Sequence, residues 1–266
     1  MPPHLGDNRP MTFASIRLLA PVAAVALGAV PASAVESRDV RFDEAGYRIV
    51  SLDLAHDRLE LHWKGDDGQA LAGIEGLRRW GDEHGRTLQF AANAGIYDRA
   101  FRPLGLHIED GTTLRPLNTV RGNGAAGNFS IQPNGVFYVD KQDHAGVLAT
   151  AAWRTRAIDA RLASQSGPML LIDGQVNPAF DEQSDSLKWR SGVCAKTPQQ
   201  VVFAVSDAPV TFHEFARLFR DELGCRDALY LDGTLSRFYT QADGYRGAPA
   251  VMQKPYVGMF AVFAAD

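Results

Sequence analysis

The sequence has 266 residues, of which 45% are hydrophobic and 22% are charged, and its formal net charge is −4. This length suffices for one well-buried domain, and the composition is that of an ordinary globular protein. The mild acidity comes without any cluster of Lys or Arg, so we expect no nucleic-acid partner.

The N-terminal 34 residues have the pattern of a secretory signal peptide. Arg17 precedes an apolar run from Leu18 to Val30, and Ala32-Ser33-Ala34 forms a cleavage site of small residues. The apolar run is too short for a membrane anchor. We therefore expect residues 1–34 to be removed, and residues 35–266 to form a periplasmic or secreted protein with no stable membrane insertion. An uncleaved anchor is the alternative.

The domain begins with strand-like and helical patterns. Residues 47–54 and 58–63 alternate apolar and polar side chains, as half-buried strands do. Residues 71–84 have the periodicity of a helix with one apolar face. Residues 88–92 form an apolar run that indicates an interior strand.

Three hairpins are predicted from turn residues between strand-like runs. Asn-Gly and Asp-Gly pairs favour such tight turns. The hairpins span residues 106–117 with a turn at Asp110-Gly111, residues 128–140 with a turn at Pro133-Asn134-Gly135, and residues 169–176 with a turn at Asp173-Gly174.

The stretch from Thr211 to Arg237 combines a helix, a short strand and a polar loop. Thr211 and Glu214 form a capping box, and Gly224 suits the position beyond the helix end. Residues 228–231 indicate a buried strand that ends at Asp232-Gly233. A strand that delivers an acid and hydroxyls to its carboxyl end is a common way to build a site. An Asp-Gly turn between two strands is the alternative.

Apolar runs at residues 201–205 and 256–264 complete the predicted sheet. No internal repeat, low-complexity stretch or linker divides the chain. We therefore predict an α+β fold, a single domain with a central mixed, mostly antiparallel β-sheet and flanking helices.

The two cysteines, Cys194 and Cys225, permit one disulfide in an oxidising compartment. The sequence does not show whether their Cα atoms come within bonding distance, so the bond stays open at this point. No further residues stand at the spacing of a cysteine metal site.

The acidic residues differ in context. Asp110 and Asp173 lie between strand-like runs, which favours hairpin turns, whereas Asp232 follows a helix and a strand and precedes hydroxyl residues. Glu109 ends a strand-like run and either faces water or provides a second carboxylate. Asp98 is expected on a loop surface.

Five segments, in this order, resemble the phosphodiester glycosidase family. They are Asn93-Ala94-Gly95-Ile96-Tyr97, Ser166-Gly167-Pro168-Met169-Leu170, Arg190-Ser191-Gly192-Val193, the helix from Thr211, and Leu231-Asp232-Gly233. A bacterial exported branch of the family is closer still. Its motifs correspond here to Pro103 to Gly111, Gly127-Asn128-Phe129, and Gln165 to Leu170, so the likeness spans about residues 88 to 262.

The resemblance implies a hydrolase that cleaves a sugar-1-phosphodiester at the anomeric carbon, with a carbohydrate phosphodiester as substrate. Asp232 then faces the anomeric centre as nucleophile, base or stabiliser of an oxocarbenium-like state, and Glu109 is the candidate second carboxylate. Arg190 suits the phosphate because its guanidinium offers a planar fork to two oxygens.

The same resemblance implies a set of substrate-binding residues. Asn93 and Asn128 would bind sugar hydroxyls or fix Asp232, since an amide both donates and accepts. Backbone donors near Ser166 and Gly167 would add to the anion site, and Ser236 would orient Asp232 or contact substrate. Gly95 and Gly233 complete the set.

The chain also departs from the family pattern. Thr234 stands where the wider family has a second glycine after the acid, and Ser236-Arg237 stands in place of its serine pair. The resemblance therefore implies the reaction class and leaves the sugar open.

Two other functions remain. Asp232 and Glu109 could hold a hard divalent ion for cleavage at phosphorus, although the sequence has no dense acidic loop or His/Asp motif and we expect no metal or other cofactor. A non-catalytic envelope module that binds glycan would use the same hydroxyl and amide residues. The sequence does not give the oligomeric state.

Overall fold

The computed structural model describes residues 1–3, 35–120, 127–233, 236–252 and 255–264. Contacts divide the chain into two units, Met1–Pro31 and Ala32–Asp266. Residues 1–3 of the first unit have no regular secondary structure, and the rest of the predicted signal peptide, residues 4–34, lies outside the described residues. In the described parts of the chain, every helix is too short or too polar to cross a bilayer.

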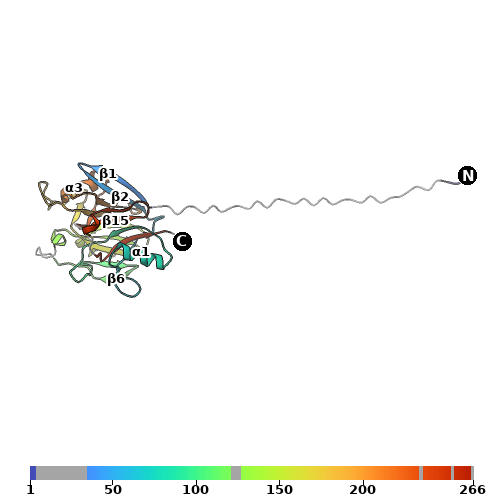
Figure 1. Cartoon of the computed structure of the whole chain (residues 1–266), viewed down its shortest axis with the longest axis horizontal. Helices are drawn as coiled ribbons and strands as arrows, with labels where there is room; N and C mark the ends of the chain where they lie inside the picture. The colour runs from blue at the N-terminus through green and yellow to red at the C-terminus, as the bar shows by residue number, and fades with distance from the viewer. Residues whose placement is uncertain (4–34, 121–126, 234–235, 253–254, 265–266) are drawn as a thin grey trace. The chain divides into compact units, whose positions relative to one another are not determined.

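In its described residues, the unit Ala32–Asp266 contains three β-sheets, in each of which the neighbouring strands are antiparallel. Strands make up most of its regular structure (Figure 1). The largest sheet has seven strands. In spatial order they are β1 (Glu36–Phe42), β2 (Ala45–Asp53), β13 (Gln200–Ser206), β12 (Arg190–Ala195), β14 (Ala228–Gly233), β10 (Met169–Ile172) and β11 (Gln175–Val176).

The other two sheets have five strands each. The second sheet contains β16 (Gly244–Gly247), β15 (Arg237–Thr240), β4 (Leu88–Asn93), β17 (Met259–Phe263) and β3 (Glu60–His62). The third contains β6 (Thr112–Arg115), β5 (His107–Glu109), β9 (Ala160–Ser166), β7 (Gly135–Asp140) and β8 (Ala145–Ala149). The prediction of one central mixed sheet was therefore wrong, whereas a single domain of mostly antiparallel strands with flanking helices is confirmed. The predicted α+β class holds only roughly, because strands predominate and helices are few.

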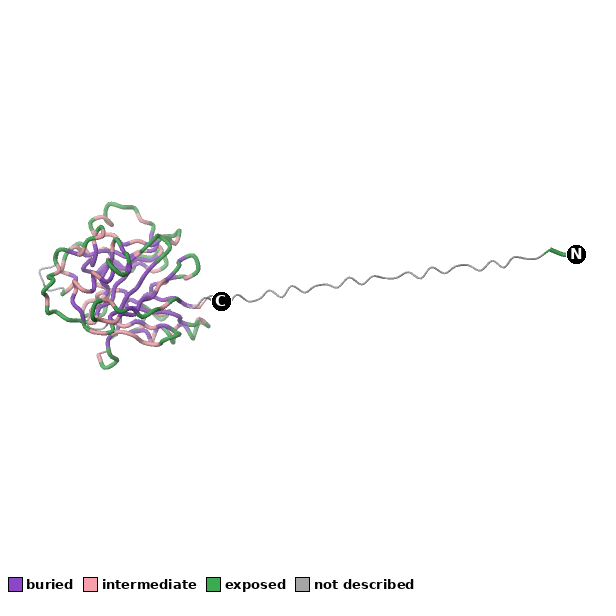
Figure 2. The backbone as a smooth tube through the Cα atoms, turned by 90° about the horizontal axis from the view of Figure 1, so that it is seen from above, coloured by how far each residue is buried: buried purple, intermediate pink, exposed green. Residues whose placement is uncertain are grey.

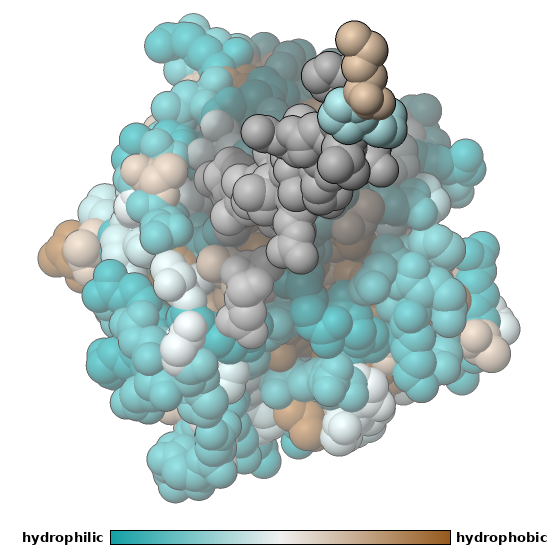
Figure 3. Space-filling model, turned by 90° about the vertical axis from the view of Figure 1, so that its right-hand side faces the viewer, coloured by the Kyte–Doolittle hydropathy of each residue, from teal (hydrophilic) through white to brown (hydrophobic). Residues whose placement is uncertain are grey.

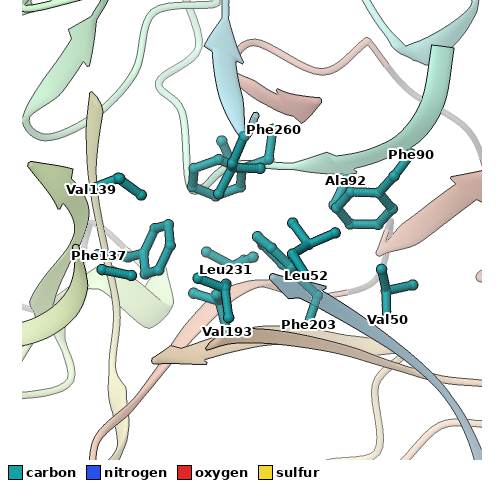
Figure 4. Close-up of a cluster of buried hydrophobic side chains, with 14 of the residues drawn as sticks. Val50, Leu52, Phe90, Ala92, Phe137, Val139, Val193, Phe203, Leu231 and Phe260 are labelled. Atoms are coloured by element: carbon teal, nitrogen blue, oxygen red, sulfur yellow. The ribbon is translucent and has the colours of Figure 1, made fainter. Parts of the chain in front are cut away.

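One hydrophobic core contains residues of all three sheets. Figure 2 shows that the buried residues lie in the centre of the unit Ala32–Asp266. Aromatic rings from the three sheets meet there (Figure 4). The ring centroid of Phe203 of β13 lies 5.1 Å from that of Phe90 of β4 and 6.1 Å from that of Phe137 of β7. Leu231 of β14 belongs to the same cluster, so the strand that precedes Asp232 is anchored in the centre of the molecule. Figure 3 shows that one outer face is mostly hydrophilic.

Helices cover the outer faces of two sheets. α1 (Ile74–Glu83) packs on β4, and a second cluster joins the first sheet to α3 (Phe212–Arg217) and the π-helix that continues it, Leu218–Glu222. The predicted capping box of Thr211 and Glu214 is present, and Gly224 has a φ of 66° just beyond the helix, as expected. Within the described stretches, the other helical segments are α2 (Thr150–Trp153) and two 3-10 turns, Gly127–Ser130 and Ala250–Met252.

Two of the three predicted hairpins are confirmed. Asp110 and Asp173, each followed by glycine, have positive φ and connect β5 to β6 and β10 to β11. The hairpin at Pro133-Asn134-Gly135 was wrong, because Gly135 begins β7, which turns instead near Asp143 into β8. Asn134 is buried. Its side-chain amide donates to Phe129 O and accepts a hydrogen bond from Thr150 Oγ1, so Asn134 joins buried segments instead of forming a turn.

A disulfide joins Cys194 of β12 to Cys225 after the helix, with Cα atoms 6.2 Å apart. The pairing that the sequence left open is therefore present, and both cysteines are buried. The bond ties the helical cover of the first sheet to the strand beside β14.

Replacing Cys194 and Cys225 together by alanine is expected to lower the free energy of unfolding by about 3–4 kcal/mol, because the bond closes a loop across a sequence separation of 31. Urea unfolding of the wild type and the double variant measures the change. Unchanged stability, together with two alkylatable thiols in the denatured, unreduced wild type, would contradict the bond.

Candidate functional site

The site centres on Asp232, which a β-bulge places at the end of β14. Ser191 of β12 lies opposite Asp232, and Gly192 lies opposite Tyr230, so Leu231 is the extra residue of the bulge. Opposite residues in an antiparallel pair project from the same face of the sheet. The bulge therefore directs the Asp232 side chain to the face that carries Ser191.

A chain of polar contacts surrounds this face. Ser191 Oγ lies 3.2 Å from Asn93 Oδ1 and 3.0 Å from Ser236 Oγ, and Ser236 Oγ donates to the Asp232 carbonyl at 2.7 Å. Asn93 comes from the end of β4 in the second sheet, so two sheets meet at this point. The structure thus brings together Asn93, Ser236 and Asp232, which the sequence singled out separately.

The Asp232 carboxylate is only partly satisfied. Its Oδ1 accepts a hydrogen bond from Gly233 N–H at 2.6 Å, whereas Oδ2 is buried and has no hydrogen-bond partner among the described residues. Burial raises the pKa of Asp232 to about 7, and the Gly233 N–H opposes this rise. Asn93 Nδ2 is a second buried atom with no partner in the described chain. Asn93 is linked to Asp232 through the hydroxyls of Ser191 and Ser236. A half-satisfied carboxyl with a raised pKa is typical of functional sites.

Gly233 is required by a close contact and not by a turn. It lies within β14, and a Cβ at this position would overlap Tyr230 Oη. Tyr230 Oη also accepts a hydrogen bond from Asn128 Nδ2 at 3.4 Å. Asn128, from the 3-10 turn of Gly127–Ser130, therefore reaches the same end of β14.

The glycine and serine candidates on β9 and after β4 also lie beside β14. Ser166 Oγ donates to Leu231 O at 3.1 Å, and Gly95, with φ of 151°, is so close that a Cβ would lie 3.4 Å from Ser166 Cβ. Gly167 differs, because its missing Cβ would meet Asn134 Cβ at 2.5 Å. Ser166 and Gly95 thus adjoin the site, while Gly167 packs against the β7 side.

Two tyrosines that the sequence did not single out lie near Asp232. Burial raises the pKa of Tyr97 and of Tyr256, and in both the Asp232 carboxylate raises it further. Arg237, whose guanidinium lies 4.3 Å from the Tyr245 ring centroid, opposes the rise at Tyr256. Tyr97 is the last residue of the motif Asn93-Ala94-Gly95-Ile96-Tyr97, and this motif was the only feature of the sequence that pointed to its position near the site.

Arg190 does not have the open position that a phosphate contact requires. Its guanidinium is fully buried, with Nε donating to Val210 O at 2.8 Å and Nη2 to Ser186 O at 2.8 Å. It stacks on the Phe212 ring at 3.7 Å, on the helical side of the sheet, because neighbouring residues of a strand point to opposite faces. Burial lowers the pKa of Arg190. The structure therefore contradicts the expected contact of Arg190 with a substrate phosphate, because Arg190 is buried on the face of the sheet opposite Asp232.

Glu109 is also separate from Asp232. Its Oε1 lies 2.7 Å from Nε2 of the buried His107, and β5 pairs with the middle of β9. Continuing that register places Glu109 beside Leu162, about 13 Å along β9 from Ser166. The two carboxylates are therefore not brought together. Asp98, as expected, lies in a loop, where its carboxylate accepts hydrogen bonds from Ala100 N and Arg102 N.

The described residues contain no group of three His, Cys, Asp or Glu side chains arranged for a metal ion.

Comparison with known proteins identifies relatives over most of the chain. The profile of the phosphodiester glycosidase family matches residues 86–262. The Escherichia coli protein YigE is 35% identical over 206 residues, which are 77% of this chain and 77% of that protein.

Two solved structures share the fold. The catalytic domain of zebrafish N-acetylglucosamine-1-phosphodiester alpha-N-acetylglucosaminidase, auto-inhibited by its pro-peptide, superposes with a TM-score of 0.60 at 15% identity, covering 89% of this chain and 85% of that one. A hypothetical protein from Synechocystis superposes with a TM-score of 0.54 at 14% identity, covering 86% of this chain and 61% of that one.

Substituting Gly233→Ala is expected to lower the free energy of unfolding by about 1–3 kcal/mol, because the new methyl group overlaps the Tyr230 hydroxyl. Adding Tyr230→Phe removes that hydroxyl and should restore part of the loss. Gly174→Ala is the control: Gly174 has a φ of 80° and open space around it, so Tyr230→Phe should not rescue it. Additive effects of Gly233→Ala and Tyr230→Phe in urea unfolding would contradict the contact.

Substituting Asp232→Asn is expected to change how stability depends on pH. The pKa of about 7 in the folded protein exceeds the ordinary 3.8, so between these values the folded state holds a proton that the unfolded state releases. The wild type should therefore lose up to about 4 kcal/mol relative to Asp232→Asn as the pH rises from about 4 to about 8. A pH-independent difference between the two proteins in urea unfolding would contradict the raised pKa.

Proposed function

Because the chain belongs to the phosphodiester glycosidase family, we propose that it is an exported hydrolase that cleaves a sugar-1-phosphodiester at the anomeric carbon. The observation that carries this proposal is the carboxylate of the half-buried Asp232, whose Oδ2 is out of water and has no partner among the described residues. An acceptor held away from water gains most when positive charge develops next to it.

Asp232 acts in its ionised form. In the reaction, the bond between the anomeric carbon and the phosphate oxygen breaks, and its electron pair leaves with a phosphate monoester. Positive charge then develops on the sugar, which Asp232 stabilises directly or by forming a covalent intermediate. Water adds its oxygen to the anomeric carbon and loses a proton. The leaving phosphate is already a stable anion, so a second, proton-donating carboxylate is not required, which agrees with the distant position of Glu109.

The surrounding residues hold the substrate. Asn93 Nδ2 has no partner among the described residues and donates to a sugar oxygen, while Asn128 acts from the end of β14, where its amide donates to Tyr230 Oη. Ser236 orients Asp232 through its carbonyl. Arg237, whose charge acts on the same Tyr256 as Asp232, takes the phosphate role that Arg190 cannot fill from its buried position.

Export is part of the proposal. The signal-peptide pattern of residues 1–34 supports it, and the disulfide agrees with an oxidising compartment such as the periplasm or the medium.

Asp232→Asn is expected to reduce release of N-acetylglucosamine from its 1-methyl phosphodiester at least about 10³-fold, because the amide cannot carry the charge that opposes the developing cation. Asp173→Asn is the matched control, since this aspartate also precedes a glycine but lies in an exposed hairpin. The wild-type kcat/KM should fall as the pH drops below about 7, where Asp232 becomes protonated.

Each alternative has its own outcome in this assay. Saturable binding of the phosphodiester with no product identifies a non-catalytic glycan-binding module. Loss of activity after exhaustive chelation, with oxygen from labelled water found on phosphate, identifies metal-dependent cleavage at phosphorus. Wild-type turnover by Asp232→Asn removes this residue from the reaction.

A further inference from the structure

The segment that carries Asn93 is anchored at the next residue, Ala94. The Ala94 N–H donates to Gly258 O at 2.8 Å, and Ala94 O accepts a hydrogen bond from Ser164 Oγ. Asn93 itself pairs with Met259 of β17, the residue after Gly258. The position of Asn93 therefore depends on what fixes Gly258 and Ser164.

A buried histidine lies against both of these anchors. His107 of β5 is 1% exposed and pairs with Ser164 of β9. Its ring is so close to Gly258 that a Cβ there would lie 2.9 Å from His107 Cε1. The φ of Gly258 lies outside the left-handed region, so glycine is needed here for the close approach of the ring.

Glu109 and Trp63 fix the His107 ring. Glu109 Oε1 lies 2.7 Å from His107 Nε2, and this nitrogen donates because an ionised carboxylate only accepts. Glu109 follows His107 by two residues on β5, so both side chains lie on the same face of the strand. The Trp63 ring meets the imidazole edge to face, with the ring centroids 6.0 Å apart. The imidazole is therefore held in one orientation against Gly258.

Loss of the Glu109 carboxylate would leave a buried ring nitrogen without this partner. A buried donor without an acceptor is costly, so the ring would turn or admit water. Either change disturbs the contact of His107 with Gly258, whose carbonyl anchors Ala94. Asn93, the neighbour of Ala94, would then move relative to the rest of the site.

We propose that Glu109 and His107 are positioning residues that hold Asn93 in place for the substrate. They act through Gly258 and Ala94 without touching the sugar. Asn93 Nδ2, which has no partner among the described residues, is the donor that they aim. This inference rests on the proposed function for the role of Asn93. It gives Glu109 a part in the reaction although the structure does not bring it to Asp232.

Steady-state kinetics with N-acetylglucosamine 1-methyl phosphodiester distinguish positioning from catalysis. Glu109→Ala should lower kcat/KM by about 10- to 100-fold, because a small displacement of a substrate-binding group is costly. Glu109→Gln should stay within about threefold of the wild type, since its amide oxygen still accepts from His107 Nε2. A catalytic carboxylate would lose its function in both variants.

A double-mutant cycle tests whether the pair acts through Asn93. In the Asn93→Ala background, adding Glu109→Ala should cost less than about twofold in kcat/KM, because the group to be positioned is absent. Glu60→Ala is the matched control. Glu60 lies 2.9 Å from His62 Nε2 at the same two-residue spacing, but His62 packs on Trp80 of α1. This variant should lose stability and keep the wild-type kcat/KM.

A spectroscopic measurement tests the coupling without substrate. The side-chain amide resonance of Asn93 in a proton–nitrogen correlation spectrum is assigned by its absence in Asn93→Ala. It should shift or broaden in Glu109→Ala, return toward its wild-type position in Glu109→Gln, and stay unchanged in Glu60→Ala.

Three results would overturn the inference. They are a loss of activity in Glu109→Gln as large as in Glu109→Ala, an undiminished further loss when Glu109→Ala is added to Asn93→Ala, and an Asn93 resonance that Glu109→Ala leaves unchanged. Failure of the proposed function has a different signature, which is a wild-type protein that releases no sugar while the Asn93 resonance still responds to Glu109→Ala.

Discussion

The buried carboxylate at the end of β14 is the constraint on which the rest of the site depends. An ionised carboxylate loses hydration on burial and stays charged only if nearby dipoles replace water. Gly233 N–H provides one such dipole, while Ser236 and Ser191 fix the backbone that carries it. Burial outweighs this partial compensation and raises the pKa to about 7, so about half of the molecules carry the ionised form at pH 7 and more do so above it. Such a carboxylate is poised to interact with a cation-like sugar.

The face of the sheet opposite Asp232 provides the rigidity that this arrangement needs. Arg190 binds two backbone carbonyls and stacks on Phe212, and its guanidinium carbon lies 5.7 Å from the Tyr230 ring centroid. The Tyr230 hydroxyl lies so close to Gly233 that a Cβ at this position would overlap it. Arg190, Phe212 and Tyr230 thus pack against the end of β14 from the face opposite the Asp232 side chain.

Local chemistry made part of this predictable from the sequence. The hairpins at Asp110 and Asp173 follow from turn preferences, and the context of Asp232 set it apart from them. The side on which Arg190 lies depends on how β12 pairs with β14, and that register is set by non-local packing. The error at Asn134 has the same origin, since a turn-like tripeptide became a buried packing site once Thr150 supplied its partner. The resemblance predicted the family correctly. No sequence motif showed that Glu109 lies away from Asp232, because its position depends on how β5 pairs with β9.

Residues that lower stability give a physical criterion for function where identity to solved relatives is too low to assign roles. The zebrafish structure shares 15% of its sequence with this chain, which supports the fold alone. Asp232 is unfavourable to folding, because its Oδ2 is out of water without a hydrogen-bond partner among the described residues and its pKa is raised to about 7. A buried acceptor that no described residue satisfies is better explained by a ligand than by a defect of packing.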